Sequence, residues 1–527
     1  MARSRGVGAV LGWAFTHALL LAAAVLAASY VPAARQAVPQ LGAVHAAAVE
    51  AWALLAPGGA WHPAAFIEHK GHLVVEASLL VVISFLLLQG TFRPSKDEEE
   101  PLTEREIDEL CDEWEPEPLY PPVSAAQTGW KEPVISSQAG TQVVVNGKTA
   151  LDMCSLNFLG IAGSGEIREA CRGTIEKYGV GSCGPRGFYG TIDVHLQLEE
   201  RLARFMGSEE AILYSYDLAT LPSIIPAFAS KKDLILCDEG VNYGIQNGAN
   251  LSRAKVLYFK HNDLQDLERL LKQQEAADRR HRKPLNRRFI VVEGIYANTG
   301  ELAPLDGIKE LKERYKYRLI VDESVALGVL GPRGRGAAEH FGCAAEDVEI
   351  VGGSMGNSLA SIGGFCAGDR EIVDHQRLSG LGYCFSASLP PFLATAGICA
   401  LDVLESRGSE LIPRVQENAR KFRKLAAAIP QLAVVGGEAD EVSPLVHLQL
   451  HPTPPPEQYA AGDEKLQALI DDCLAREGVL LALARYSKLE RARPPPSLRV
   501  AITAAHTHAD LQKAVAAIKA SAKRVLG

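Results

Sequence analysis

Short apolar runs alternate with segments of helix length from about residue 143 to residue 527, and this alternation limits the folds that the chain can adopt. The clearest runs lie at residues 234–237, 289–292, 319–321 and 348–351. Strands that are separated by helices pair in parallel, and such a sheet is apolar on both faces, so helices must cover both. The pattern therefore predicts an α/β domain with a mostly parallel sheet and helices on both faces.

Small or acidic residues stand at the ends of these runs, namely Asp238, Glu293, Asp322 and Gly352. In an open α/β sheet, ligands bind in the crevice outside the carboxyl ends of the strands. We therefore expect a functional site at this edge of the sheet.

The C-terminal part of the chain carries its own strand pattern, at residues 445–450 and 498–502. A run rich in proline and charge, at residues 451–464, interrupts it. We therefore assign residues 143–405 to a large domain and residues 406–527 to a smaller α+β domain.

Composition sets wider limits on function. The chain has 527 residues, 47% of them hydrophobic, so it can bury one large α/β unit with smaller additions. A formal net charge of −9 argues against nucleic acid as a partner, because no basic stripe is available to neutralise phosphates. The ten cysteines are scattered without a C-x-x-C pair. This spacing predicts reduced thiols and neither a metal site nor a redox dithiol.

An apolar run at residues 72–89 has one formal charge, Glu76, and is long enough to cross most of the hydrocarbon layer of a membrane. It predicts a transmembrane helix, with a buried core helix as the alternative. A second apolar run, residues 7–31, lies in an N-terminal extension of residues 1–65. A signal peptide, a signal anchor and a second span all remain open for it.

Positive charges predict the orientation of these segments. Arg3 and Arg5 precede the first run, and Arg93 and Lys96 follow the second. Because basic residues favour the cytosolic side, the charges fit a two-span hairpin that leaves the main domain in the cytosol.

Residues 90–142 form an acidic and proline-rich connector. Thr103 and Glu106 have the spacing of a capping box, which predicts a short helix through about Cys111. A solvated connector is typical of this composition, and docking onto the main domain through Trp114 is the alternative.

Five glycines occur from Gly179 to Gly190. Glycine permits positive φ and close backbone approach, so this loop can wrap a ligand or a partner, whereas a cluster of surface turns is the simpler explanation. Further along, the chain has no lysine between Lys316 and Lys421. The absence of lysine from this stretch becomes informative when it is compared with the family that the surrounding sequence resembles.

The glycine-rich loop resembles the G-x-G-x-x-G-x-R-x-x-x-G block of the α-oxoamine synthases, which are pyridoxal-phosphate-dependent acyltransferases. His195 begins an H-x-x-L-E block of the same family, and Asp322 begins a stretch similar to its D-E-A-H-S-x-G-V-x-G-x-x-G-R-G block. The resemblance covers roughly residues 66–527. It implies a fold-type I, pyridoxal-phosphate-transferase-like domain in which an aspartate at the position of Asp322 pairs with the cofactor ring.

Four positions depart from the family pattern. Asn357 stands where the family keeps its cofactor-binding lysine, and an amide nitrogen cannot form the Schiff base because its lone pair is delocalised. Val325 and Asn242 replace histidines, and Asp217 places a carboxylate near the cofactor phosphate. The resemblance therefore implies that this chain has no catalytic residue of its own and that Asp322 is vestigial.

Other parts of the family pattern are retained. Ser386 lies in an F-S-A-S-L-P-P segment, which in the family reaches the cofactor phosphate of the neighbouring subunit. Arg499 matches an arginine that grips the substrate carboxylate, and it is either a vestige of that role or an ordinary ion pair or strand-edge charge. The loop residues expected beside the partner's site are Gly181, Cys183, Gly184, Arg186, Gly187 and Tyr189.

Within this family, the motifs resemble the serine palmitoyltransferases, in particular the type of subunit that lacks the lysine. The resemblance implies a lysine-bearing catalytic partner that binds pyridoxal phosphate, together with small activating subunits and sphingolipid-sensing regulators in the endoplasmic reticulum membrane. The implied reaction condenses L-serine with palmitoyl-CoA to 3-oxosphinganine, the first step of sphingolipid biosynthesis. A purely scaffolding or regulatory membrane protein and a self-sufficient α-oxoamine synthase remain as alternatives.

Overall fold

The computed structural model describes residues 102–119, 133–281, 286–437, 440–487 and 489–527. The chain divides into two units, Met1–Ser124 and Ala125–Gly527, and each is described here by itself. The predicted membrane segments at 7–31 and 72–89 lie outside the described residues. Among the described residues, no helix combines the length and the apolar character that a membrane crossing needs.

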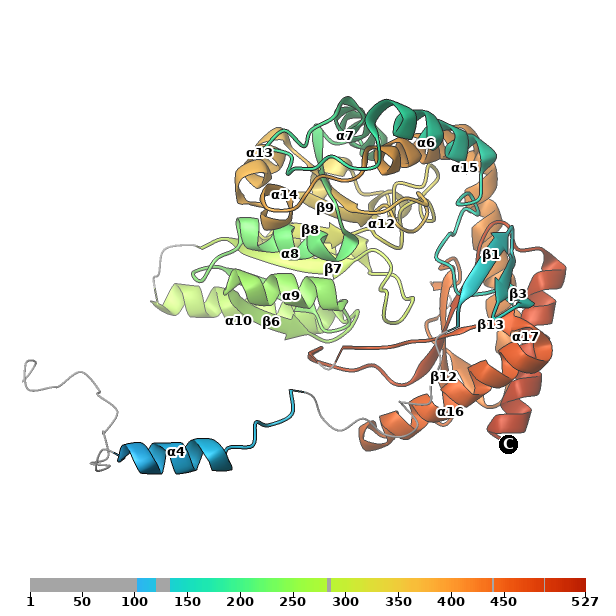
Figure 1. The fold of residues 1–527 in the computed structure, drawn as a ribbon. Helices are drawn as coiled ribbons and strands as arrows, with labels where there is room; N and C mark the ends of the chain where they lie inside the picture. Colours follow the sequence, from blue (N-terminus) through green and yellow to red (C-terminus); the bar gives the residue numbers. More distant parts are fainter. Residues whose placement is uncertain (1–101, 120–132, 282–285, 438–439, 488) are drawn as a thin grey trace, which may run out of the picture. The chain divides into compact units, whose positions relative to one another are not determined.

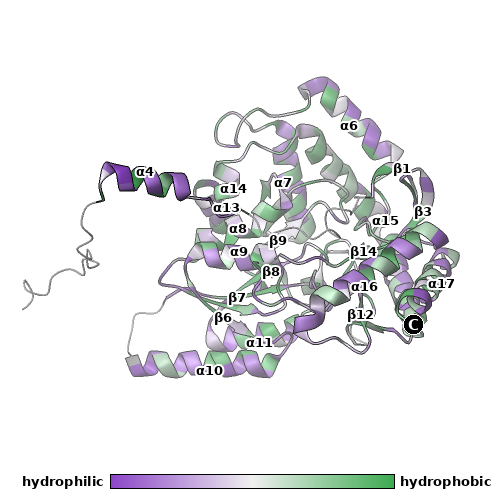
Figure 2. Ribbon diagram, turned by 60° about the horizontal axis from the view of Figure 1, so that its bottom comes forward, coloured by the Kyte–Doolittle hydropathy of each residue, from purple (hydrophilic) through white to green (hydrophobic). Residues whose placement is uncertain are grey.

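The first unit contributes helix α4 (Glu104–Glu113). The predicted capping box is confirmed: the Thr103 backbone N–H donates to Glu106 Oε2 (2.8 Å), and the Glu106 N–H donates to Thr103 Oγ1 (3.4 Å). The helix ends at Glu113, two residues beyond the expected end, and the backbone becomes extended at Trp114. Apolar and polar residues both occur along it (Figure 2).

A seven-stranded sheet forms the centre of the second unit, in the order β4-β10-β9-β8-β7-β5-β6 (Figure 1). Strand β10 runs antiparallel to β4 and β9, and the other pairs are parallel, so the predicted mostly parallel sheet is confirmed. The strand bounds are β4 (Glu210–Tyr214), β5 (Leu234–Asp238), β6 (Lys255–Phe259), β7 (Arg288–Glu293), β8 (Arg318–Asp322), β9 (Ile350–Ser354) and β10 (Gly364–Gly368). Strand β9 begins two residues later than predicted, and β4, β6 and β10 were not expected.

Helices cover this sheet on both faces. Figure 2 shows α8 and α9 on one side of strands β6, β7 and β8, and α10 and α11 on the other. The helices of this part are α6 (Gly165–Tyr178), α7 (Asp193–Met206), α8 (Asp217–Phe228), α9 (Tyr243–Ser252), α10 (Leu264–His281), α11 (Leu305–Tyr315), α12 (Ala337–His340), α13 (Arg370–Ser379), α14 (Leu381–Cys384) and α15 (Pro391–Ala426).

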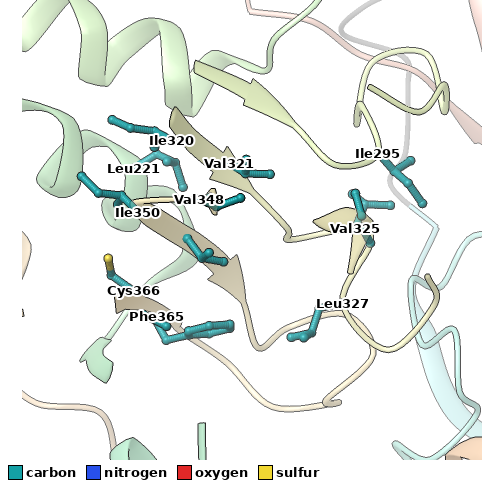
Figure 3. Packing of buried hydrophobic residues seen from close by; sticks show 14 of the residues in the cluster. Leu221, Ile295, Ile320, Val321, Val325, Leu327, Val348, Ile350, Phe365 and Cys366 are labelled. Carbon is teal, nitrogen blue, oxygen red and sulfur yellow. The ribbon is translucent and has the colours of Figure 1, made fainter. Parts of the chain in front are cut away.

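The core of the large domain lies between these layers. Figure 3 shows Val321, Ile350 and Phe365, which come from the neighbouring strands β8, β9 and β10. Burial on both faces accounts for the β-branched residues in β8 and β9.

The C-terminal part forms a smaller α+β domain around an antiparallel sheet, in the order β11-β12-β15-β14. A third sheet, β1-β2-β3-β13, joins this domain to residues 135–152, because β13 pairs in parallel with β3. The bounds are β1 (Ile135–Ala139), β2 (Gln142–Val145), β3 (Lys148–Asp152), β11 (Leu432–Val434), β12 (Leu445–Leu450), β13 (Val479–Leu480), β14 (Ala482–Leu483), β15 (Ser497–Ala501), α16 (Tyr459–Asp472) and α17 (His508–Val525).

Two predicted domain boundaries differ from this arrangement. Strand β1 lies within the segment 90–142 that was assigned to the connector. The boundary between residues 405 and 406 falls inside the single helix α15. The physical reason is that α15 serves two cores: Leu404 packs into that of the large domain and Phe422 into that of the small one.

Candidate functional site

Two buried carboxyl groups lie side by side at the carboxyl ends of β7 and β8, because Glu293 and Asp322 are paired in register. Asn242, the N-cap of α9, contacts both of them. Its Nδ2 donates to Asp322 Oδ2 (3.1 Å), and its backbone N–H donates to Glu293 Oε1 (2.6 Å). Acidic residues at these strand ends therefore gather at one edge of the sheet, and the amide of Asn242 lies next to the aspartate.

Hydrogen bonds inside the chain satisfy these carboxyl groups. Asp322 Oδ1 accepts from the Ser324 backbone N–H (3.0 Å) and from its hydroxyl, and Glu293 Oε2 accepts from the Ala297 N–H (3.0 Å). Burial, and then the neighbouring Asp322 carboxylate, raise the pKa of Glu293 to about 8. Burial also raises the pKa of Asp322. Each of these two carboxyl groups therefore holds a proton more readily than a carboxyl group in water does.

Asn357 lies in the loop after β9. It occupies the sequence position at which the family has its lysine. Its Nδ2 donates to the Ser324 backbone oxygen (2.7 Å). The amide thus connects the loops that follow β8 and β9, and it has a structural contact where the family has a nucleophile.

Asp217 is the first residue of α8. Its Oδ2 accepts a hydrogen bond from the hydroxyl of Ser354 (2.7 Å), and Ser354 Oγ accepts in turn from the Gly356 N–H (2.9 Å). Asp217 is exposed to solvent, but its carboxyl group is partly buried, and this burial raises its pKa. The hydrogen bonds from Ser354 and Gly363 lower the pKa and offset part of this rise. The carboxylate at the start of this helix is thus held by donors from the end of β9 and from the loop after it.

Val325 belongs to the hydrophobic cluster in which Figure 3 also shows Ile295 and Leu327. Its side chain is 4% exposed and carries no polar group for a cofactor ring. Together with the amide of Asn357, the amide of Asn242 on Asp322 and the Asp217 carboxylate at the start of α8, this shows that the described residues do not fit pyridoxal phosphate in this chain.

The two loops expected at a partner's site lie together. The Ser388 N–H donates to the Gly184 oxygen (2.9 Å), Ser182 Oγ donates to the Ser388 oxygen (3.0 Å), and His195 Nε2 contacts the Leu389 oxygen (2.6 Å). Ser386 lies in the same loop, after α14, and is half-exposed. Its hydroxyl contacts the oxygen of the adjacent Ala387 (3.3 Å).

The glycine-rich loop has a backbone that few residues could adopt. A Cβ atom on Gly190 would lie 1.9 Å from the Gly184 oxygen, so only glycine fits there. Cys183 and Tyr189 have φ angles of 58° and 66° and exposed side chains. Gly181 and Gly187 are exposed as well, so most of the loop faces outward.

Arg186 is the exception in this loop, because its guanidinium points inward. Its two terminal nitrogens donate to the Glu199 carboxylate on α7 (2.7 and 2.9 Å), and its Nε donates to Thr191 Oγ1 (3.1 Å). Both charged side chains are buried. Arg186 therefore holds the loop to α7 and does not itself face outward.

Arg499 lies on β15, in register with His447 of β12. Its Nε is buried and has no hydrogen-bond partner, and no ion pair of its guanidinium is found among the residues that the structure describes. Burial lowers the pKa of His447 to about 4, so this neighbour is neutral at pH 7. The ion-pair explanation of Arg499 therefore has no partner within the described part of the chain.

Sequence reasoning missed several polar contacts of this region. His261 lies between Asp238 (2.7 Å) and Glu301 (3.1 Å), and although burial opposes its charge, these carboxylates raise its pKa to about 10. Glu293 was noted only as an acidic strand end, and Ser354 was not singled out. Within the described ranges, no cluster of His, Cys, Asp or Glu is arranged to hold a metal ion.

Comparison with known sequences shows which proteins this chain resembles. Residues 148–518 match the family described as aminotransferase class I and II. Long chain base biosynthesis protein 1b of Oryza sativa subsp. japonica is 45% identical over 460 residues, which are 87% of this chain and 93% of that protein. Serine palmitoyltransferase 1 of Dictyostelium discoideum is 40% identical over 86% of this chain and 94% of its own length.

The fold has solved relatives too. A variant of serine palmitoyltransferase from S. paucimobilis, with a bound adduct of pyridoxal phosphate and myriocin, superimposes with a TM-score of 0.66 at 26% identity. The match covers 80% of this chain and 96% of that one.

Proposed function

Because the chain belongs to the class I and II aminotransferase family, and within it to the proteins called long chain base biosynthesis protein 1 or serine palmitoyltransferase 1, we propose that it is the non-lysine subunit of a heteromeric serine palmitoyltransferase. The enzyme condenses L-serine with palmitoyl-CoA to 3-oxosphinganine, with release of carbon dioxide and CoA. A lysine-bearing partner binds pyridoxal phosphate and carries out the bond making. One observation supports this division of roles between two subunits. Asn357 stands at the position that needs a nucleophile, and its amide instead donates a hydrogen bond to the Ser324 oxygen.

A partner surface is supported by exposed apolar side chains on the two loops that lie together. Phe385 is 78% exposed and Phe188 is 68% exposed, and Tyr189 and Val180 are exposed beside them in the sequence. Large apolar side chains gathered at one place mark an interaction surface. We assign this surface, which consists of the loops 179–190 and 385–389, to the catalytic partner.

The chain's own residues have a supporting role in this proposal. The Arg186–Glu199 ion pair fixes the glycine-rich loop on α7, and the hydrogen bonds from Ser388 and Ser182 fix the second loop against the first. Ser386 is then presented to the partner's cofactor phosphate by a loop whose position is set from both sides. The retained sequence of both loops is explained in this way, although this chain has lost its own chemistry.

Ser386→Ala should weaken cofactor binding in the reconstituted pair. Loss of one hydroxyl bond to a charged phosphate costs about 1.5–3 kcal/mol, or roughly a ten- to hundredfold rise in the apparent Kd for pyridoxal phosphate. The measurement is cofactor titration of the apoenzyme, followed by turnover. Ser406→Ala, on the exposed face of α15, is the matched control and should change neither.

A purely scaffolding or regulatory role is the second candidate, and the exposed helix α4 favours it, since an apolar stripe with Ile107 and Leu110 needs a covering surface. Unchanged cofactor affinity and turnover in Ser386→Ala, with normal assembly of the pair, would select this candidate. A self-sufficient synthase is disfavoured because the described site does not fit the cofactor.

We extend the proposal to the endoplasmic reticulum membrane, with residues 72–89 as a transmembrane helix and the main domain in the cytosol. Small activating subunits and sphingolipid-sensing regulators then engage this helix through side-chain packing within the bilayer. The run at residues 7–31 forms a second span in the hairpin arrangement.

A glycosylation acceptor inserted near Ala46 tests this topology. In microsomes it should be modified, because the hairpin places residues 32–71 in the lumen. An acceptor inserted at the exposed Asp306 should stay unmodified. An unmodified site near Ala46 would count against the lumenal loop.

A further inference from the structure

We propose that the amino-terminal edge of the seven-stranded sheet is a docking surface for the headgroups of anionic phospholipids. This goes beyond the proposed function, which brings the chain to the membrane only through its apolar runs. The surface, here called the basic edge, consists of exposed basic side chains beside the starts of four neighbouring strands: Lys231, Lys232, Arg253, Lys255, Arg287, Lys316 and Arg318.

Backbone pairing brings the residues of the basic edge together. The Lys255 N–H donates to the Asp233 oxygen (3.0 Å), which joins the starts of β6 and β5. The Leu234 N–H donates to the Arg287 oxygen (3.0 Å), which joins the starts of β5 and β7. Strand β8 continues the row, because Arg318 is paired in register with the second residue of β7. Neighbouring strands lie about 4.8 Å apart, so the four strand starts span roughly 15 Å and can contact several headgroups at once.

The charges of the basic edge are not used inside the protein. Among the residues that the structure describes, none of its side chains takes part in an ion pair, whereas exposed arginines elsewhere pair within their helix, as Arg204 does with Glu200. Two acids beside the edge are already engaged. Asp233 accepts hydrogen bonds from two backbone N–H groups (2.9 Å each), and Asp278 pairs with the arginine that begins β7 (2.7 Å). The positive charge of the edge is therefore available to an external anion.

This concentration of positive charge contrasts with the chain as a whole. The formal net charge is −9, and local sequence shows no basic stripe, because the basic edge is assembled from four separate segments. An anionic surface repels an acidic protein on average but attracts a basic patch on it. The basic edge therefore determines which side of the domain approaches such a surface.

Lipid headgroups suit this edge better than nucleic acid does. Proteins that bind single strands offer aromatic side chains on which bases stack, and the exposed aromatic residues of the second unit lie in other segments, such as the loops of Phe188 and Phe385. Beside Arg253 stands Leu251, which is 52% exposed and can enter the boundary between headgroups and acyl chains. The apolar run at residues 72–89 predicts a membrane nearby, and cytosolic leaflets carry anionic lipids.

The basic edge and the candidate site lie at opposite ends of the same strands (Figure 1). Strand β7 begins beside Arg287 and ends at Glu293, and β8 begins at Arg318 and ends at Asp322. At about 3.3 Å per residue, the two ends of β7 are roughly 17 Å apart. A substitution on the basic edge therefore leaves the carboxyl pair and the partner-facing loops in place.

Lysine footprinting of the full chain in lipid nanodiscs tests the inference. The discs contain phosphatidylcholine with or without phosphatidylglycerol, and neither lipid has an amine that reacts with a water-soluble acylating reagent. With phosphatidylglycerol, Lys231, Lys232 and Lys255 should be labelled at least roughly fivefold more slowly, because one basic residue near an anionic surface already favours contact by about that factor. Lys513 and Lys519, which are exposed on α17, should be labelled at the same rate in both discs.

Salt and charge reversal sharpen the result. About 1 M salt should remove the protection, because charges are then screened beyond roughly 3 Å. Lys231→Glu/Lys232→Glu should restore fast labelling of Lys255 in the anionic discs, and the matched control Lys513→Glu/Lys519→Glu should not. All four side chains are exposed, so the melting temperature should stay that of the original chain, and the salt series needs no variant.

Equal labelling of the basic edge in both discs, or equal protection of the α17 lysines, would overturn the inference. Protection in phosphatidylcholine discs that appears only with the partner subunit would assign the edge to a protein instead. Protection by a single-stranded oligonucleotide but not by phosphatidylglycerol would assign it to nucleic acid.

If the chain does not stay with the discs, it should still sediment with phosphatidylglycerol vesicles and not with phosphatidylcholine vesicles. Failure to do so counts equally against the basic edge. None of these outcomes bears on the condensation reaction, because no turnover is measured. Conversely, an inactive reconstituted pair leaves the footprint of the basic edge standing.

Discussion

Purified without a partner, the full chain is expected to produce no 3-oxosphinganine from L-serine and palmitoyl-CoA, and Asn357→Lys is expected to leave it inactive. The amide at the lysine position accounts for the first result. Three further obstacles account for the second, namely the Asp217 carboxylate at the start of α8, Asn242 on Asp322, and Val325 in the core. Removal of the catalytic apparatus typically forfeits a rate enhancement of about a millionfold or more. The measurement is incorporation of labelled serine into lipid.

The same assay with the lysine-bearing partner added is the positive control, and activity only in the pair is the expected outcome. A visible absorbance band in the lone chain that borohydride abolishes would contradict the proposal, because it would reveal a Schiff base that this site should not form. Activity of Asn357→Lys alone would show that a single substitution separates this chain from a self-sufficient enzyme.

The second large effect concerns the buried ion pair between Arg186 and Glu199. Arg186→Ala or Glu199→Ala should destabilise the chain by about 3–5 kcal/mol, since each leaves a buried charge without its partner. The Glu199 carboxylate also accepts from the Leu213 N–H (3.1 Å), so its loss reaches strand β4. Thermal unfolding of the full chain measures the change, and assembly with the partner should fail in parallel because the glycine-rich loop is released.

An exposed pair on the same helix offers a matched control. Arg204 and Glu200 are 2.8 Å apart with most of each side chain in solvent, so Arg204→Ala should cost no more than about 0.5 kcal/mol. The double replacement Arg186→Met/Glu199→Leu should be far less harmful than either single alanine variant, because no unpaired charge remains. Equal and small effects for the buried and exposed pairs would contradict this account of the loop.

Local sequence predicted the parts of the fold that depend on local pattern. Strands such as β5 and β8 were found because their apolar runs are continuous, and the capping box of α4 because it spans four residues. Strand β10 (Gly364–Gly368) was missed because its composition, with glycine at both ends, does not favour a strand, and its identity depends on pairing with β4 and β9. The pairing of β3 with β13 joins residues that are more than 300 positions apart.

The candidate site, too, was predicted only where local sequence was sufficient. The motif positions of Asn357, Val325 and Asp217 could be identified from the order of residues, but the hydrogen bonds that give two of them a structural role could not. The contact of Asn242 with Asp322 joins residues 80 positions apart, and no local rule predicts it. Arg186 was expected beside a partner's site, whereas its guanidinium needs Glu199 as a buried counter-ion.

Helix α15 (Pro391–Ala426) gives the subunit a mechanical property. At about 1.5 Å per residue its 36 residues span roughly 54 Å, from the end of the loop that carries Ser386 to the core around Phe422. If the helix stays straight, a tilt of the small domain displaces that loop as well. A bend at Pro413 would absorb the tilt. In the proposed pair, motion of the small domain would be transmitted along α15 to the loop that carries Ser386 and so to the partner's site.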